Sequence, residues 1–277
     1  MVISHPYVAV RYYEAEENTI MSSIICIANQ KGGVGKTTTA VNLSASLAAA
    51  EKRVLLVDID PQGNASSGTG IDKTSLTSSI YDLIINGEDP NDLLMDTDLK
   101  NLQVIPATPD LAGAELELIE IPEREMQLKK ILAKLKRDYD FIIIDCPPSL
   151  GLLTLNAMTA AHSVIIPLQT EFYAMEGLSQ IVRTINLVQK GLNPGLRIEG
   201  IVLTMYDGRN NLSKQVDDEI RAHFGSQVFK TVIPRNVRLS EAPSHGKPII
   251  LYDITSRGAV AYLELAKELI QRGGGNG

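Results

Sequence analysis

The stretch that decides the fold runs from Ile24 to Thr38 and reads I-I-C-I-A-N-Q-K-G-G-V-G-K-T-T. Five apolar residues come first and predict a buried strand, and the glycines after them predict a tight turn into a helix. Glycine tolerates backbone conformations in which successive amides point inward at a phosphate. In the usual phosphate-binding pattern, G-x-x-x-x-G-K-[ST], a glycine stands where this chain has Gln30. The stretch carries instead a second lysine, Lys31, five residues before Lys36.

These residues predict a nucleotide site. Lys36 would reach the β- and γ-phosphates, and Thr37 would offer its hydroxyl to Mg²⁺. The helix that begins here would point its positive end at the phosphates. A glycine-rich turn without a ligand is the alternative, and two lysines and a threonine at these spacings disfavour it. The residues predicted to contact the nucleotide are Lys31, Gly32, Gly33, Val34, Gly35, Lys36, Thr37 and Thr38.

The composition is that of an ordinary globular protein, with 277 residues, of which 44% are hydrophobic, and a net charge of −7. This charge argues against a strongly basic nucleic-acid binder but leaves room for a local basic face. No apolar run approaches the roughly 20 residues of a membrane helix, and no signal peptide follows Met1. Cys26 and Cys146 lie in apolar runs, which predicts reduced, buried thiols. We therefore expect a cytoplasmic protein without a membrane partner.

From Ile24 onward, apolar runs alternate with helical patterns, which predicts βαβ units and a parallel sheet. The expected strands are 24–29, 53–57, 102–106, 141–145, 163–167, 197–204 and 229–233. The expected helices are 37–50, 110–120, 123–137, 152–160, 175–189, 213–224 and 256–271, with short helical segments at 79–85, 91–95 and 238–245. The fold class is therefore α/β, a doubly wound, mostly parallel sheet with helices on both faces.

The domain organisation expected from this pattern is one domain over residues 23–272, because no linker divides the chain. Residues 1–22 fit poorly with the βαβ pattern of this domain, and we expect them to be a disordered extension or the product of an upstream start codon. The glycine-rich residues 273–277 are expected to be a flexible tail.

Three aspartates follow predicted strands at the edge where open parallel sheets bind ligands. Asp58 and Asp60 come after strand 53–57, and Asp145 ends strand 141–145. Nucleotide hydrolysis requires a held Mg²⁺ and an oriented water. We expect Asp145 to hold a metal-bound water, Asp60 to position and polarise the attacking water, and Asp58 to support the metal's outer shell. A single aspartate at a strand end is more commonly a cap, so this prediction depends on all three sharing one edge with the loop.

Three segments together resemble the deviant Walker A ATPases, and specifically the ParA/Soj family of chromosome- and plasmid-partitioning proteins. They are K-G-G-V-G-K-T-T (31–38), D-I-D-P-Q-G-N-A-S (58–66) and I-I-I-D-C-P-P-S (142–149), and V-I-P-R-N-V-R-L-S-E-A-P-S-H-G-K-P-I (232–249) also matches that family. The resemblance covers about residues 23–270. It implies a P-loop fold, ATP and Mg²⁺ as ligands, and an ATPase that is weak alone and stimulated by a ParB/Spo0J-like partner.

The resemblance also implies residue roles. Lys31 corresponds to the signature lysine, which crosses to the nucleotide of a second subunit in an ATP-bound sandwich dimer. A cation supplied by the second subunit compensates the charge of two triphosphates that face each other. Pro234 and Asn236 are implied to lie near the adenine. The residues expected to act in catalysis are Lys31, Lys36, Asp58 and Asp60.

A basic face for DNA is indicated more weakly. Residues 200–277 carry ten basic and eight acidic side chains, although the whole chain is acidic. Such a segment is compatible with a surface that contacts DNA phosphates once two subunits pair, and solvated surface charges are the alternative. In similar proteins, arginines at the positions of Arg209 and Arg238 carry non-specific DNA binding, and we add Arg235 and Lys247. We expect backbone contacts that salt weakens, and therefore a nucleoid-associated protein.

Relatives with the same loop act in other ways. A MinD-like membrane ATPase should end in a basic amphipathic helix with apolar anchors, whereas 259–271 contains Glu264 and Glu268 and is followed by glycines. An iron–sulfur carrier requires exposed cysteines or a C-x-x-C pair, and a bacterial tyrosine kinase a terminal tyrosine cluster; the sequence shows neither pattern. An ATP-gated regulator of a protein partner, such as a replication initiator, stays open as an alternative.

Overall fold

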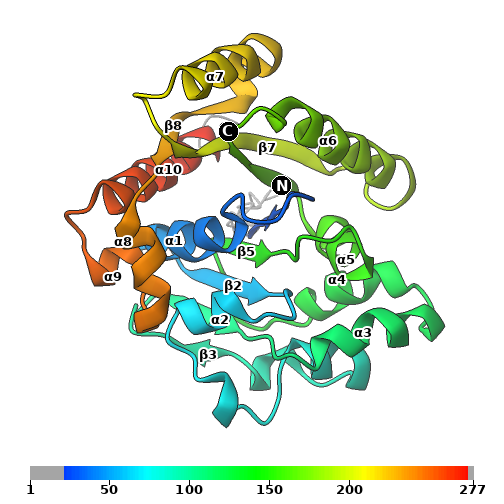
Figure 1. Cartoon of the computed structure of the whole chain (residues 1–277). Helices are drawn as coiled ribbons and strands as arrows, with labels where there is room; N and C mark the ends of the chain where they lie inside the picture. The colour runs from blue at the N-terminus through cyan, green and yellow to red at the C-terminus, as the bar shows by residue number, and fades with distance from the viewer. Residues whose placement is uncertain (1–21, 274–277) are drawn as a thin grey trace, which may run out of the picture.

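The computed structural model describes residues 22–273, and an eight-stranded sheet lies at its centre (Figure 1). The strand order is β3-β4-β2-β5-β1-β6-β7-β8. Neighbouring strands are parallel except for β3 and β4, which are antiparallel. The strands are β1 (Ser23–Ile27), β2 (Val54–Asp58), β3 (Met95–Asp96), β4 (Leu102–Ile105), β5 (Phe141–Asp145), β6 (Ser163–Gln169), β7 (Arg197–Tyr206) and β8 (Val228–Pro234). The predicted mostly parallel sheet is confirmed.

Helices cover both faces of this sheet, as the doubly wound prediction requires. They are α1 (Lys36–Ala49), α2 (Asn64–Gly68), α3 (Leu111–Glu117), α4 (Gln127–Leu132), α5 (Leu152–Ala160), α6 (Ala174–Gly191), α7 (Asn211–Phe224), α8 (Val237–Glu241), α9 (Ile249–Tyr252) and α10 (Arg257–Gly273). One apolar cluster joins the sheet to α1, α9 and α10, and the other joins it to α3–α7. Among residues 22–273, none of these helices combines the length and apolar character that crossing a membrane requires.

Alternation along the central strands explains the two clusters. In β1, Ile25 and Ile27 pack toward α1 and α10, while Cys26 packs into the opposite cluster. Both thiols predicted to be buried, those of Cys26 and Cys146, are buried and free. Because each strand carries apolar side chains on both faces, the sheet is stable only when helices cover both.

The chain ends lie mainly outside the described residues. Of the expected N-terminal extension, residues 1–22, only Ser22 is described, and its hydroxyl donates to the carbonyl of Tyr139 at 2.6 Å. Of the expected tail, 273–277, only Gly273 is described, as the last residue of α10.

Two helix predictions were wrong. Residues 91–95 do not form a helix: Pro90–Asp92 is a single 3-10 turn, and Met95 pairs with Val104 as an edge strand that covers β4. The predicted helix 123–137 ends at Leu132. Beyond it, the Asn91 side chain donates to the carbonyl of Lys134 and accepts from the amide of Lys136, so this contact replaces helical hydrogen bonds.

The sequence pattern also missed α2, whose residues Asn64–Gly68 have low helix propensity. The Asp58 carboxylate accepts hydrogen bonds from the amide and the hydroxyl of Ser66, at 2.8 and 2.7 Å. A buried side chain from outside this short helix therefore supplies the acceptor that its first turn needs. Helix α2 is therefore stabilised by a contact with Asp58 rather than by its own sequence.

Candidate nucleotide-binding and hydrolysis site

The glycine-rich loop follows β1 at the centre of the sheet, where β5 and β6 flank it on either side. Gly33 and Gly35 have φ of +73° and +87°, the left-handed region in which only glycine is unstrained. Gly35 directly precedes Lys36, the first residue of α1. The loop is anchored from outside by Thr204 of β7, whose hydroxyl donates to the carbonyl of Val34 at 2.9 Å. Loop amides and the α1 N-terminus therefore meet at one point, the arrangement that binds phosphate.

Lys36 is buried, and its ammonium donates to the carbonyl of Lys31 across the loop at 3.1 Å. Burial lowers its pKa, and the nearby Asp145 carboxylate is the largest opposing influence. An ammonium that makes one hydrogen bond to a carbonyl retains donors for a phosphate.

Asp145 lies fully buried at the end of β5, and both its carboxylate oxygens lack a hydrogen-bond partner among residues 22–273. Burial raises its pKa well above 3.8, and the neighbouring Asp58 raises it further, whereas the Thr37 hydroxyl and the Lys36 ammonium act in the opposite direction. A buried carboxylate without a partner, beside a threonine hydroxyl, offers the oxygen ligands that Mg²⁺ prefers. The residues therefore fit the metal predicted from the sequence.

Asp58 is the register partner of Asp145 in the adjacent strand, but it is fully engaged. Its Oδ1 accepts from the amide of Asp60 at 3.1 Å, and its Oδ2 accepts from the amide and hydroxyl of Ser66. Burial raises the pKa of Asp58 to about 6. Its contacts place it as the residue that holds Asp60 and α2, next to Asp145.

Asp60 is nearly buried, and its Oδ1 accepts from the amide of Gln62 at 2.9 Å. That bond fixes the start of the turn Asp60–Gly63. Because Oδ2 has no hydrogen bond among the described residues, this oxygen remains available to a water near the loop.

The nucleotide-free chain should lose stability relative to Asp145→Asn as the pH rises above about 4. Asp145 has a raised pKa in the folded chain, so the folded state keeps a proton that the unfolded state releases above pH 3.8. This contribution is present below pH 4 and disappears as the pH passes the raised pKa of Asp145. Thermal unfolding of both chains at several pH values measures it, and comparison between the two removes effects of other carboxylates. A difference in Tm that does not grow with pH contradicts the prediction.

A cavity of about 220 Å³ opens beside the loop between β7 and α8. It contains Pro234 and Asn236, the two residues implied to lie near the adenine, together with Gly35 and Thr38. Met205 also lines it and has a φ of +50°, a conformation that is strained in a methionine. Because the cavity adjoins the loop, a nucleoside whose phosphates lie in the loop could occupy it.

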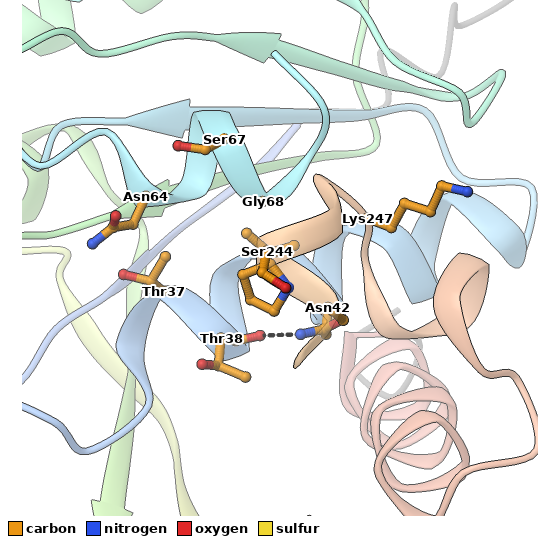
Figure 2. Close-up of a pocket in the computed structure, with 11 residues that line it drawn as sticks. Thr37, Thr38, Asn42, Asn64, Ser67, Gly68, Ser244 and Lys247 are labelled. Atoms are coloured by element: carbon orange, nitrogen blue, oxygen red, sulfur yellow. Dashed lines mark hydrogen bonds between the residues drawn. The ribbon is translucent and has the colours of Figure 1, made fainter. Parts of the chain in front are cut away.

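A larger cavity of about 430 Å³ lies on the other side of Thr38, between α1, α2 and residues 242–247 (Figure 2). Figure 2 shows Thr37 near Asn64 of α2, and Asn42 donating to the carbonyl of Thr38. The two cavities share Thr38 and Pro243. Pro234 and Asn236 line only the smaller one.

Lys31 does not point into its own loop. Its ammonium forms an ion pair with Glu171 at 2.8 Å, in the connection between β6 and α6. Both side chains are nearly half exposed, 40% for Lys31 and 47% for Glu171.

Three of the four predicted DNA contacts follow the ends of two paired strands. The end of β7 pairs with the end of β8, and the amide of Arg235 donates to the carbonyl of Tyr206. Arg209, Arg235 and Arg238 therefore emerge near the same end of these two strands. Lys247 lines the larger cavity beside α2, and its amide donates to the carbonyl of Ala242, directly after α8.

Several residues at the site carry no sequence signal. Thr204, Met205 and Tyr262 line the smaller cavity, and Glu171 pairs with Lys31. No motif or spacing marks them, because each reaches the loop only through strand pairing or helix packing. Ser66 lies within the quoted segment 58–66, and its role with Asp58 required the fold.

Comparison with known proteins agrees with this geometry. A family model described as an AAA domain matches residues 22–198. The chain is 61% identical to a chromosome partitioning protein ParA of Myxococcus xanthus over 249 residues, 90% of this chain and 88% of that protein. It is also 61% identical to the sporulation initiation inhibitor protein Soj of Bacillus subtilis over 253 residues, 91% of this chain and all of that protein.

A solved structure with a different name has the same fold. It is a cobyrinic acid a,c-diamide synthase of Mycobacterium smegmatis with bound ADP and magnesium, 41% identical, with a TM-score of 0.80 over 92% of this chain and 96% of that one. Its identity is 20 percentage points below that of the two partitioning relatives. The loop, the carboxylates beyond β2 and β5 and these relatives lead to one assignment: the chain belongs to the ParA/Soj family of chromosome-partitioning proteins and is an ATPase that uses ATP and Mg²⁺.

Proposed function

We propose that the chain is an ATP-operated DNA-partitioning switch. In this proposal ATP brings two copies together as a sandwich dimer, the dimer binds DNA without sequence preference, and a ParB-like partner accelerates hydrolysis and so releases the DNA. The observation that carries it is the direction of Lys31, which leaves its own loop and stands half exposed beside Glu171. A loop lysine in that position is available to a nucleotide on a second chain.

Within each subunit, the chain's residues divide the work of hydrolysis. Lys36 and the loop amides hold the phosphates, and Thr37 and Asp145 would hold Mg²⁺, which when bound neutralises charge on the β- and γ-phosphates. The free oxygen of Asp60 orients the attacking water and accepts its proton. The adenine occupies the smaller cavity, against Pro234 and Asn236.

The proposed DNA face consists of Arg209, Arg235 and Arg238, together with Lys247. The Arg209 guanidinium donates two hydrogen bonds to Asp207, at 3.0 and 2.9 Å, and these bonds lower the pKa of Asp207 to about 2. Arg238 pairs with Glu241 at 2.9 Å. All these groups are on the surface, where such ion pairs are weak, so DNA phosphates can displace the carboxylates.

Retention of DNA should require ATP and should be lost in Lys31→Ala and Arg238→Glu. Lys31→Ala removes the cation that joins the subunits, and Arg238→Glu replaces a phosphate contact by a repulsion in each subunit. We expect Arg238→Glu to weaken binding by at least about 10-fold at low salt. Gel shifts with duplexes of unrelated sequence, with ATP and without nucleotide, measure both effects.

Lys134→Glu is the matched control, because it also reverses one charge but follows α4, far from α8 in Figure 1. It should bind DNA as the wild type does. Two outcomes would falsify the proposed switch. In the first, the wild type binds no DNA in the presence of ATP; in the second, Lys31→Ala still dimerises normally. If the protein dimerises in the presence of ATP but does not bind DNA, the alternative is favoured, namely a regulator that acts on a protein partner.

We also propose that residues 23–272 form a single ATPase domain and that the protein works in the cytoplasm on the nucleoid. The continuous sheet from β3 to β8 supports the first statement. The second follows from the proposed DNA binding.

A further inference from the structure

The contact that holds Lys31 in the nucleotide-free chain is itself built by the fold. Glu171 lies between β6 and α6, where its amide donates to the carbonyl of Gln169 and its carbonyl accepts from Ala174, each at 2.9 Å. The Gln169 side chain donates to Oε1 of Glu171, which leaves Oε2 to face the Lys31 ammonium at 2.8 Å. Contacts within the connection between β6 and α6 therefore position the Glu171 carboxylate independently of Lys31.

Lys31 is held from its other side as well. Its amide donates to the Asn29 side chain at 3.0 Å, and Asn29 donates to the carbonyl of Pro167 in β6 at 2.7 Å. Both ends of Lys31 are thus tied to β6 and the connection after it. The side chain is thus directed toward β6 and the connection after it, while the carbonyl of Lys31 accepts from Lys36 within the loop.

One ammonium cannot pair closely with this carboxylate and also reach a triphosphate on another subunit. We propose that Glu171 is a positioning residue that restrains Lys31 in the nucleotide-free chain, so that pairing of two ATP-bound subunits must break this ion pair in each of them. The inference rests on the proposed function, since it assumes that Lys31 crosses between subunits. Glu171 thereby raises the nucleotide concentration at which the chain dimerises.

The exposure of the pair supports a restraint that can be exchanged. With side chains 40% and 47% exposed, the ion pair is screened by water, and such exposed pairs are weak. The next two residues, Phe172 and Tyr173, are 77% and 65% exposed and pack edge to face, with ring centroids 5.1 Å apart. The restrained lysine therefore lies on an open surface that a second copy can reach.

The test measures dimer formation as a function of a non-hydrolysable ATP analogue, by light scattering at fixed protein concentration with Mg²⁺. Glu171→Gln should lower the half-maximal analogue concentration by about 1.5- to five-fold, because each dimer breaks two such pairs and binds two nucleotides. Raising the salt concentration should bring wild type and variant together, since screening weakens the wild-type ion pair. A merely structural role for Glu171 predicts no such convergence.

Glu176→Gln is the matched control. Glu176 lies in the first turn of α6 and lines the same surface hollow of about 360 Å³ as Lys31, but makes no ion pair among the described residues. It should leave the half-maximal concentration unchanged. If the wild type dimerises but Glu171→Gln needs as much analogue or more, the restraint is overturned; if the wild type does not dimerise, the proposed function itself fails.

Discussion

Replacing Asp145 by asparagine should reduce ATP hydrolysis by about 100-fold or more and leave the nucleotide-free chain at least as stable as the wild type. Both oxygens of Asp145 are buried and make no hydrogen bond among residues 22–273. Burial disfavours this carboxylate more strongly than the nearby Thr37 hydroxyl and Lys36 ammonium favour it, and asparagine removes the charged form while it keeps the shape of the side chain. We expect a gain of about 1 kcal/mol near pH 7, measured by chemical denaturation, alongside phosphate release.

The neighbouring carboxylate provides a control of opposite sign. Asp58→Asn should destabilise the chain by about 1–3 kcal/mol, because one amide oxygen cannot accept the three hydrogen bonds that the carboxylate now takes from Asp60 and Ser66. If Asp145→Asn also destabilises the chain by this amount, Asp145 has a structural partner and its assignment to the metal is wrong.

Replacing Asp60 by alanine should slow hydrolysis by about 100- to 1,000-fold and leave ATP-dependent pairing intact. Among the described residues, the side chain accepts a single hydrogen bond, from the amide of Gln62, so its removal costs the fold little. ATP should then persist, and the dimer should accumulate. Phosphate release and the mass in solution, measured on the same samples, separate loss of hydrolysis from loss of binding.

Asp60→Asn distinguishes a base from a turn residue. Asparagine keeps an oxygen for the Gln62 amide but accepts no proton, so hydrolysis should fall as it does in the alanine variant. Near wild-type hydrolysis in Asp60→Asn means that only the turn matters. If Asp60→Ala does not dimerise in the presence of ATP, the proposal that Asp60 acts in hydrolysis and not in dimerisation is wrong.

The central strands and the nucleotide loop were predictable because their causes are local. Short apolar runs such as 141–145 are typical of buried strands, and the glycines at 33 and 35 serve a turn whose φ values other residues resist. The elements that the pattern misjudged have causes elsewhere in the fold. Helix α2 depends on Asp58, and the helix beginning at Gln127 gives way where Asn91 binds the backbone.

The site shows the same division. Residue type and strand position predicted that Lys36, Thr37, Asp60 and Asp145 share one edge of the sheet. The carboxyl ends of parallel strands meet at that edge. Their differences could not be derived in this way. Within residues 22–273, Asp58 accepts hydrogen bonds from Ser66 of α2, whereas Asp145 has no hydrogen-bond partner, and this difference depends on where α2 packs.

The sequence by itself determined a nucleotide-binding α/β fold and a family, and it predicted which side chains surround the phosphates. These follow from backbone geometry and short-range spacing, which a linear pattern records. Only the tertiary structure decided that Lys31 faces Glu171, 140 residues away, and that three of the four predicted DNA contacts lie near the ends of β7 and β8. The physical reason is that charges act across space: the direction of a flexible lysine depends on where strand pairing places the nearest carboxylate.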